Sequence, residues 1–186
     1  MTRNARVWTL ALIGLVALAA SAPPRVAAAA SAAEIRRDSL TALQNLYDKE
    51  TAARLLGEKA KGILVFPSIV KGGFVVGGQI GEGSLWKKGR VAGYYNSVAA
   101  SYGLQAGLQT FGYALFFMND AALKQLDDTH GFELGVGPSI VVVDAGLARS
   151  MTTNTLTSDV YAFIFSQKGL MAGIGIQGSK ITRVEK

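Results

Sequence analysis

The sequence predicts an α+β domain in which an N-terminal amphipathic helix packs on a curved, Gly-rich, mostly antiparallel sheet, with one further short helix. Two patterns indicate this class: apolar residues recur at helical spacing up to about Ala60, and runs of period-two alternation follow. In addition, Gly recurs among apolar β-forming residues between Lys61 and Gly83. Because Gly inside a strand marks bulges, sharp coiling or close backbone approach, we expect a strongly curved sheet.

The N-terminus has the layout of a secretory signal peptide. Arg3 and Arg6 precede an apolar run over residues 7–20, and small residues crowd residues 21–33. The apolar run is shorter than the ~20 residues that a membrane-spanning helix needs. We therefore expect residues 1–30 to be a cleaved Sec-type signal peptide, with an uncleaved anchor as the alternative.

The composition limits the cellular compartment and the kinds of partner that we expect for this protein. The chain of 186 residues contains no Cys, which excludes a disulfide framework and lipid attachment to a Cys near the cleavage region. We expect a secreted, periplasmic product in which residues 31–186 form one domain. Loss of Arg3, Arg6 and Arg25 with the signal lowers the formal charge from +6 to +3. That excess is too small to indicate nucleic-acid binding.

The first predicted element of the mature chain is a helix over residues 34–60. This segment contains no Pro and gathers apolar residues on one face. We expect an interruption near Asp48–Thr51 and an end around Gly57. Its polar face carries Arg36 and Arg37, so the helix either covers one face of the sheet or docks on a lipid surface.

Short strands with period-two patterns follow the helix. Pro67 and the Gly72–Gly73 pair separate the first two of them. One face of the third and fourth is made of small residues, which lets another layer approach closely. The predicted strands are Ile63–Phe66, Phe74–Ile80, Tyr94–Tyr102 and Phe111–Met118.

One short helix interrupts the β-rich part. Asn119 is a predicted N-cap for a helix from about Asp120 to Leu126. Three more strands are predicted beyond it, and Val160–Phe165 is apolar on both faces, as expected for a central strand. These later strands are Ile140–Val143, Val160–Phe165 and Leu170–Ile176.

Three strings, in this order, carry a family resemblance: KGILVFPSIVKGGFVVGGQIGEG from Lys61, AGYYNSVAASYGLQAGLQTFGYALFFMND from Ala92, and QKGLMAGIGIQGSKITRVEK from Gln167. The chain from roughly Lys59 to Arg183 resembles a bacterial member of the SYLF family of lipid-binding domains. In eukaryotic relatives the resemblance implies binding to phosphoinositide-rich membranes, often through the N-terminal helix and basic residues. In yeast-type members it implies actin binding and bundling, and it implies no enzymatic activity.

The chain departs from those eukaryotic relatives. It has an export signal and no room for the Src-homology or zinc-finger modules that accompany the domain there. Actin and phosphoinositides are not expected in a bacterial envelope. We therefore expect this chain to share the binding of lipid surfaces with those relatives, but not the binding of actin. The expected partner is therefore an anionic phospholipid membrane.

Basic residues and one Trp are the candidate lipid contacts. The segment Ser84–Arg90 has the composition of a hairpin tip with Trp beside three cations, and Trp and cations both favour anionic membrane interfaces. The alternative for each cation is an ordinary solvated charge. The candidates are Arg36, Arg37, Lys61, Lys71, Trp86, Lys87, Lys88, Arg90, Lys168 and Lys180.

Catalytic and metal-binding patterns are weak. His130 is the only His, and its position between a helix end and a strand favours a turn or capping role. Asp127, Asp128 and His130 lack the separated spacing of metal ligands. The Gly-rich run at residues 78–83 reads GQIGEG, which is not the GxGxxG pattern of a dinucleotide-binding loop, and no GxxxxGK[ST] phosphate loop occurs in the chain. We expect no enzymatic activity, no metal and no cofactor.

The sequence therefore predicts a non-enzymatic, membrane-associated lipid-binding module that acts peripherally at an anionic phospholipid surface of the bacterial envelope. The alternative is an envelope scaffold or protein-interaction domain that has a protein partner and no direct lipid role.

Overall fold

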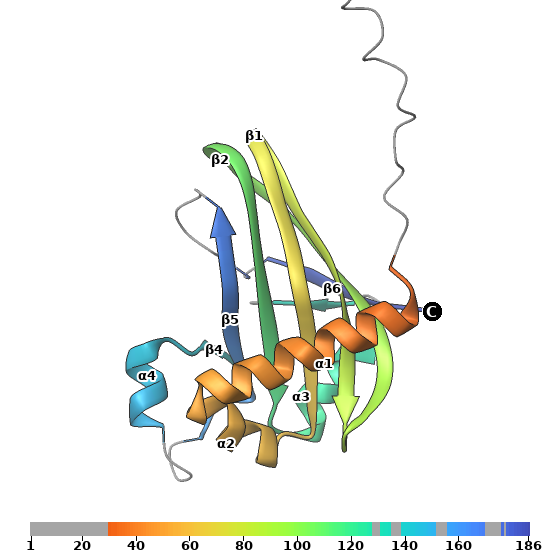
Figure 1. Cartoon of the computed structure of the whole chain (residues 1–186), viewed down its shortest axis with the longest axis vertical. Coiled ribbons are helices and arrows are strands. Elements are labelled where there is room, and N and C mark those ends of the chain that lie inside the picture. The colour runs from red at the N-terminus through yellow and green to blue at the C-terminus, as the bar shows by residue number, and fades with distance from the viewer. Residues whose placement is uncertain (1–29, 128–130, 135–138, 152–155, 170–175, 177) are drawn as a thin grey trace, which may run out of the picture.

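Two helices precede a curved sheet, which confirms the predicted α+β class (Figure 1). The computed structural model describes residues 30–127, 131–134, 139–151, 156–169, 176 and 178–186. The helices are α1 (Ala32–Lys49), α2 (Thr51–Lys59), α3 (Asp120–Lys124), the 3-10 helix η1 (Gln125–Asp127) and α4 (Ala145–Ser150). The strands are β1 (Gly62–Lys87), β2 (Arg90–Phe117), β3 (Phe132–Glu133), β4 (Ile140–Val142), β5 (Val160–Gly169) and β6 (Lys180–Val184).

The predicted N-terminal helix is present as a broken pair. Ser31 and Glu34 form a capping box, in which the Ser31 N–H donates to the Glu34 carboxylate over 2.8 Å. Glu50 has extended backbone angles, φ −125° and ψ 100°, which confirms the interruption predicted near Asp48–Thr51. The helix α2 ends at Lys59, two residues beyond the end predicted around Gly57. Tyr47 packs on Gly57 where a β carbon would otherwise lie, and this contact offsets the cost of Gly inside a helix.

The four short strands predicted between Ile63 and Met118 are in fact two long ones, β1 and β2. Pro67 does not end a strand, because it lies in a register shift between Phe66 and Ile69. A bulge leaves residues unpaired, so Pro needs no ladder N–H there. The glycines at 72 and 73 precede a second shift, between Gly73 and Val75. Both features that suggested strand ends instead bend a continuous strand.

Strand β2 is the centre of the sheet. It pairs with β1 along one edge and with β5 and β6 along the other, and the full path is β3-β6-β2-β5-β4. All pairs are antiparallel except β4 with β5. The prediction of a mostly antiparallel sheet with a central strand at Val160–Phe165 is therefore confirmed.

The sheet curls until its two halves face each other. In Figure 1 the long strands β1 and β2 rise together, bend over and return to the level of the helices. A β carbon on Gly81 would lie 2.5 Å from the backbone oxygen of Ser68, a residue of the first half of the same strand. Gly therefore permits a close approach of backbone to backbone, as predicted.

Alternation along β2 divides the apolar residues into two cores. One set of side chains points into the curl, where the Tyr113 hydroxyl donates to Ser97 Oγ over 2.7 Å. The other set points outward and packs under α1, α2 and α4. The inner set from β2 includes Tyr95, Phe111, Tyr113, Leu115 and Phe117, and the outer set includes Ala114 and Phe116.

The inner core is closed by α3 and η1. Asn119 accepts a hydrogen bond from the Ala122 N–H over 2.8 Å, so the predicted N-cap is confirmed. Leu123 and Leu126 from this segment are buried in the inner core. A second short helix, α4, was not predicted. Of the predicted strand Leu170–Ile176, only Ile176 belongs to the described residues, and it is buried.

A Gly81→Ala substitution tests the curl. The added methyl group would meet the Ser68 carbonyl and the Ile69 side chain, so we expect the free energy of unfolding to fall by roughly 1–3 kcal/mol. Gly78→Ala is the matched control, because the nearest atom to its β carbon is the Ala99 oxygen at an ordinary 3.5 Å. Urea unfolding measures both, and equal stability of the two variants would contradict the close approach.

Asp159 gives the fold a predictable pH dependence. Hydrogen bonds from Asn119 Nδ2 (2.7 Å) and from the Ser139 N–H and hydroxyl (3.1 Å each) lower the pKa of Asp159. A lowered folded-state pKa stabilises the fold above the unfolded value of about 3.9, and this stabilisation is lost as pH falls through the folded value. We expect Asp159→Asn to lower Tm most near pH 6 and least near pH 3. A difference independent of pH would contradict the assignment.

Candidate functional site

Four of the predicted lipid contacts come together at one corner of the molecule. Arg36 of α1 and Arg90 of β2 line a shallow hollow of about 300 Å³ together with Trp86. A second hollow, of about 380 Å³, shares Trp86 and Gly89 with the first and adds Lys88 and the α1 residue Leu40. We call Arg36, Leu40, Trp86, Lys88 and Arg90 the basic corner.

A tight turn sets the position of the cations. Lys87 and Arg90 are the last paired residues of β1 and β2, so the loop between them is Lys88-Gly89. Both loop residues have positive φ, 51° and 74°, as a two-residue hairpin turn requires. The predicted hairpin tip is thus present, and its turn directs Lys88 and Arg90 to the side where α1 lies.

Trp86 does not offer the exposed ring expected of an interfacial anchor. Its side chain is only 7% exposed and packs in the outer core. Its Nε1 is buried and has no hydrogen-bond partner among the described residues. The apolar group that the corner does expose is Leu40, at 37%. Trp86 therefore supports the corner from beneath.

The other predicted contacts are dispersed. Arg37 is paired with Asp38 at 2.9 Å, and this hydrogen bond and the charge of Asp38 raise the pKa of Arg37. Lys71 is only 8% exposed, on β1 opposite Gln109 of β2. Three more are on other parts of the sheet: Lys61 just before β1, Lys168 on β5 opposite Thr110, and Lys180 on β6 opposite Val98. Lys87 is half-buried at the end of β1, outside the residues that line the two hollows.

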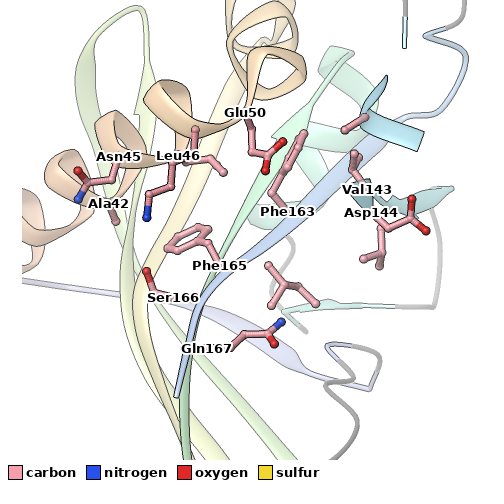
Figure 2. A pocket seen from close by; sticks show the side chains of 14 residues that line it. Ala42, Asn45, Leu46, Glu50, Val143, Asp144, Phe163, Phe165, Ser166 and Gln167 are labelled. Carbon is pink, nitrogen blue, oxygen red and sulfur yellow. The ribbon is translucent and has the colours of Figure 1, made fainter. Parts of the chain in front are cut away.

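A groove larger than either of these hollows lies on the other flank of α1, between α1, α4 and β5 (Figure 2). We call it the α1–β5 groove; its volume is about 430 Å³. Leu46, Phe163 and Phe165 supply apolar and aromatic surface. Polar side chains surround that surface: Asn45, Lys49, Glu50, Asp144, Ser166 and Gln167.

The shape of the groove depends on two backbone features. The break at Glu50 turns the chain from α1 into α2 at one end of the groove. Ser166 has φ 54°, in the left-handed region that costs a residue other than Gly roughly 1–3 kcal/mol. Residues held in such a conformation cluster at functional sites, which marks the groove as a second candidate.

The groove could not be predicted from the sequence, because its walls come from segments more than 90 residues apart, around Leu46 and around Val142 to Gln167. Phe163 and Phe165 were assigned correctly to a buried strand, but which side would stay open was not predictable from periodicity. The positive φ of Ser166 could not be predicted either, because a Ser residue does not by itself indicate that conformation.

The described residues provide little for catalysis or for binding a metal. No three Asp, Glu or His side chains gather in them closely enough to hold a metal ion, and His130 lies outside them. The pKa of Tyr47, which lines the second hollow of the corner, is raised by burial and then by the charge of Glu58.

Among the described helices, none combines the length and the apolar character needed to span a bilayer.

Substitution of Trp86 separates a supporting role from a membrane anchor. We expect Trp86→Ala to lower the free energy of unfolding by roughly 3–5 kcal/mol, because it removes a large buried ring. Trp86→Phe keeps most of the buried volume and should retain most of the stability. Thermal unfolding followed by circular dichroism measures both variants, and an unchanged Tm for Trp86→Ala would contradict the supporting role.

Comparison with known proteins agrees with the resemblance. Residues 98–186 match the Ysc84 family, described as Las17-binding protein actin regulator. No curated protein matches the chain. The matched segment contains most of β2 and every later element of the sheet, whereas α1, α2 and β1 precede it. Ysc84, or SYLF, domains are non-catalytic binding modules. Residues 98–186 therefore match the family that the sequence resembles, the Ysc84 (SYLF) family.

Proposed function

We propose that the protein is a peripheral lipid-binding module that is exported to the periplasm and binds an anionic membrane surface of the bacterial envelope. The observation that carries the proposal is the basic corner, where Arg36 and Arg90 line one hollow and Lys88 lines the adjoining one, although some 50 residues separate Arg36 from the other two in sequence. The match to this family supports a binding role over a catalytic one.

The corner suits weak, reversible attachment. A cation near an anionic membrane surface contributes about 1 kcal/mol, so three cations provide about 3 kcal/mol, or roughly a hundredfold in partition. Leu40 adds a small exposed apolar surface beside the cations. Glu58 lines the second hollow and opposes part of this attraction. Attachment therefore depends on a high density of anionic lipid and on low salt.

The corner recognises the negative charge of a lipid surface and not a particular headgroup. Its cations come from a helix and a turn, and among the described residues no hydrogen bond joins their side chains. Such a surface responds to the negative potential of phosphatidylglycerol or cardiolipin bilayers.

Vesicle flotation tests the proposal. The protein produced from its full sequence should float with phosphatidylglycerol vesicles at low salt and progressively less as salt rises. Arg36→Glu/Arg90→Glu reverses two charges of one hollow and should lower the bound fraction at least tenfold. The matched control is Lys168→Glu/Lys180→Glu, which makes the same charge change at two exposed sites on β5 and β6.

Two outcomes would contradict the proposal. Absence of flotation on all anionic vesicles at low salt would reject lipid binding. An equal loss in both double variants would show that net charge, and not the corner, drives attachment.

A second candidate function, an envelope scaffold with a protein partner, rests on a different surface. Ile80 of β1 and Val98 of β2 are cross-strand partners and are 55% and 45% exposed. Adjacent exposed apolar side chains are typical of protein contact sites. Crosslinking in cells would trap a defined partner, and the Arg36→Glu/Arg90→Glu variant would leave that product unchanged.

A further inference from the structure

We infer that the α1–β5 groove binds a zwitterionic phosphoethanolamine headgroup, with its ammonium at Glu50 and its phosphate toward Lys49 and Arg149. This inference deepens the proposed function, since it names a lipid class for a membrane-binding protein, but it concerns a different site. The groove lies on the flank of α1 away from the basic corner.

Glu50 is the anionic group of the proposed site. Figure 2 shows its side chain directed into the groove beside Phe163. The backbone of Glu50 is held on both sides, because its N–H donates to the Leu46 carbonyl over 2.9 Å and its carbonyl accepts from Ala53 over 3.0 Å. Its carboxylate makes no hydrogen bond or ion pair with any described residue and plays no part in capping α2. A half-buried carboxylate without a partner calls for a cationic ligand.

The aromatic rings beside Glu50 favour an ammonium group. Phe163 and Phe165 line the same groove. An aromatic face attracts a cation within ~6 Å of the ring centre, and this attraction is strongest where water is excluded. The Phe165 ring packs directly on Gly112 of β2, where a β carbon would collide with it, so its position is fixed by the sheet. A carboxylate next to aromatic rings is suited to a primary ammonium ion.

Positive charge lies next to Glu50 as well. An adjoining hollow of about 520 Å³ shares Lys49, Glu50 and Ala148 with the groove, and Arg149 lines it. Within the part of the chain that the structure describes, neither Lys49 nor Arg149 has an ion-pair partner. A ligand at this junction meets one anion, Glu50, and two cations, Lys49 and Arg149. Phosphoethanolamine carries the complementary charges on adjacent groups.

The remaining acid of the groove does not change this assignment. Asp144 caps α4, where its carboxylate accepts a hydrogen bond from the Leu147 N–H over 2.7 Å. In Figure 2 its side chain points away from Phe163 and Phe165. Glu50 is therefore the carboxylate available to a ligand on the aromatic surface. Asn45 and Gln167 can donate hydrogen bonds to those oxygen atoms of the ligand that lie in the groove.

This arrangement predicts selectivity between lipids. A phosphatidylglycerol headgroup has no ammonium, so it would leave Glu50 unpaired and place a second negative charge close to it. Phosphatidylethanolamine satisfies both charges. The groove should therefore prefer the zwitterionic lipid, in contrast to the basic corner, which is attracted to the anionic one.

Isothermal titration calorimetry with short-chain lipids tests the inference without a membrane. The probes are dihexanoyl phosphatidylethanolamine and dihexanoyl phosphatidylglycerol, both below their micelle concentrations, added to the protein produced from its full sequence. We expect the ethanolamine lipid to bind at least tenfold more tightly. Glu50→Gln keeps the size of the side chain and should weaken binding of that lipid at least tenfold.

Two further variants keep the test decisive. Glu58→Gln removes the same charge from α2, outside the groove, and should leave the affinity unchanged. Phe165→Leu keeps an apolar wall but removes an aromatic face, and should weaken binding severalfold. Circular dichroism establishes that each variant is folded.

Equal affinity for the two lipids, absence of binding, or an equal loss in Glu50→Gln and Glu58→Gln would overturn the inference. Its failure is distinguishable from failure of the proposed function, since the flotation vesicles contain no phosphatidylethanolamine and the calorimetric probes form no surface. Glu50→Gln should likewise leave flotation unchanged.

Discussion

The close approach of β1 to itself is the constraint on which the rest of the structure depends. A β carbon at Gly81 or Gly83 would meet the backbone of Ser68 or Val65, so only residues without side chains let the strand fold over at this distance. The fold-over encloses Tyr95 and Tyr113 in an inner core. It also returns the β1–β2 turn to the level of α1, so the basic corner exists because of glycines that lie outside it.

The second determinant is the alternation of side chains along β2. Every residue from Phe111 to Phe117 is buried, and odd and even positions serve different cores. The outer core fixes α1 across the sheet, and the Ser39 hydroxyl adds a hydrogen bond to the Val65 carbonyl over 3.2 Å. With its position fixed, α1 forms part of the wall of the basic corner on one flank and of the α1–β5 groove on the other. One helix thus positions both candidate sites.

The parts of this structure that depend on local chemistry could be predicted from the sequence. The N-cap at Asn119, the helix break near Glu50 and the hairpin tip at Lys88-Gly89 all follow from residues within a few positions of each other. Strand ends could not be predicted, because Pro67 looks the same in sequence whether it ends a strand or lies in a bulge. The burial of Trp86 and the meeting of Arg36 with Arg90 depend on where α1 crosses the sheet, which no local pattern encodes.

The small net charge of residues 31–186 is compatible with electrostatic attachment, because the distribution of the charges matters more than their sum. Screening limits exposed charges to interactions within a Debye length of about 8 Å at physiological salt. Cations on distant strands, such as Lys168 and Lys180, therefore add little to a contact made at the corner. Three cations at one corner outweigh a larger number spread over the sheet. A surface of this kind senses charge density but does not distinguish headgroups, whereas a groove with both signs of charge distinguishes headgroups at any charge density. The basic corner would therefore respond to the charge density of a membrane, and the α1–β5 groove to the headgroups of its lipids.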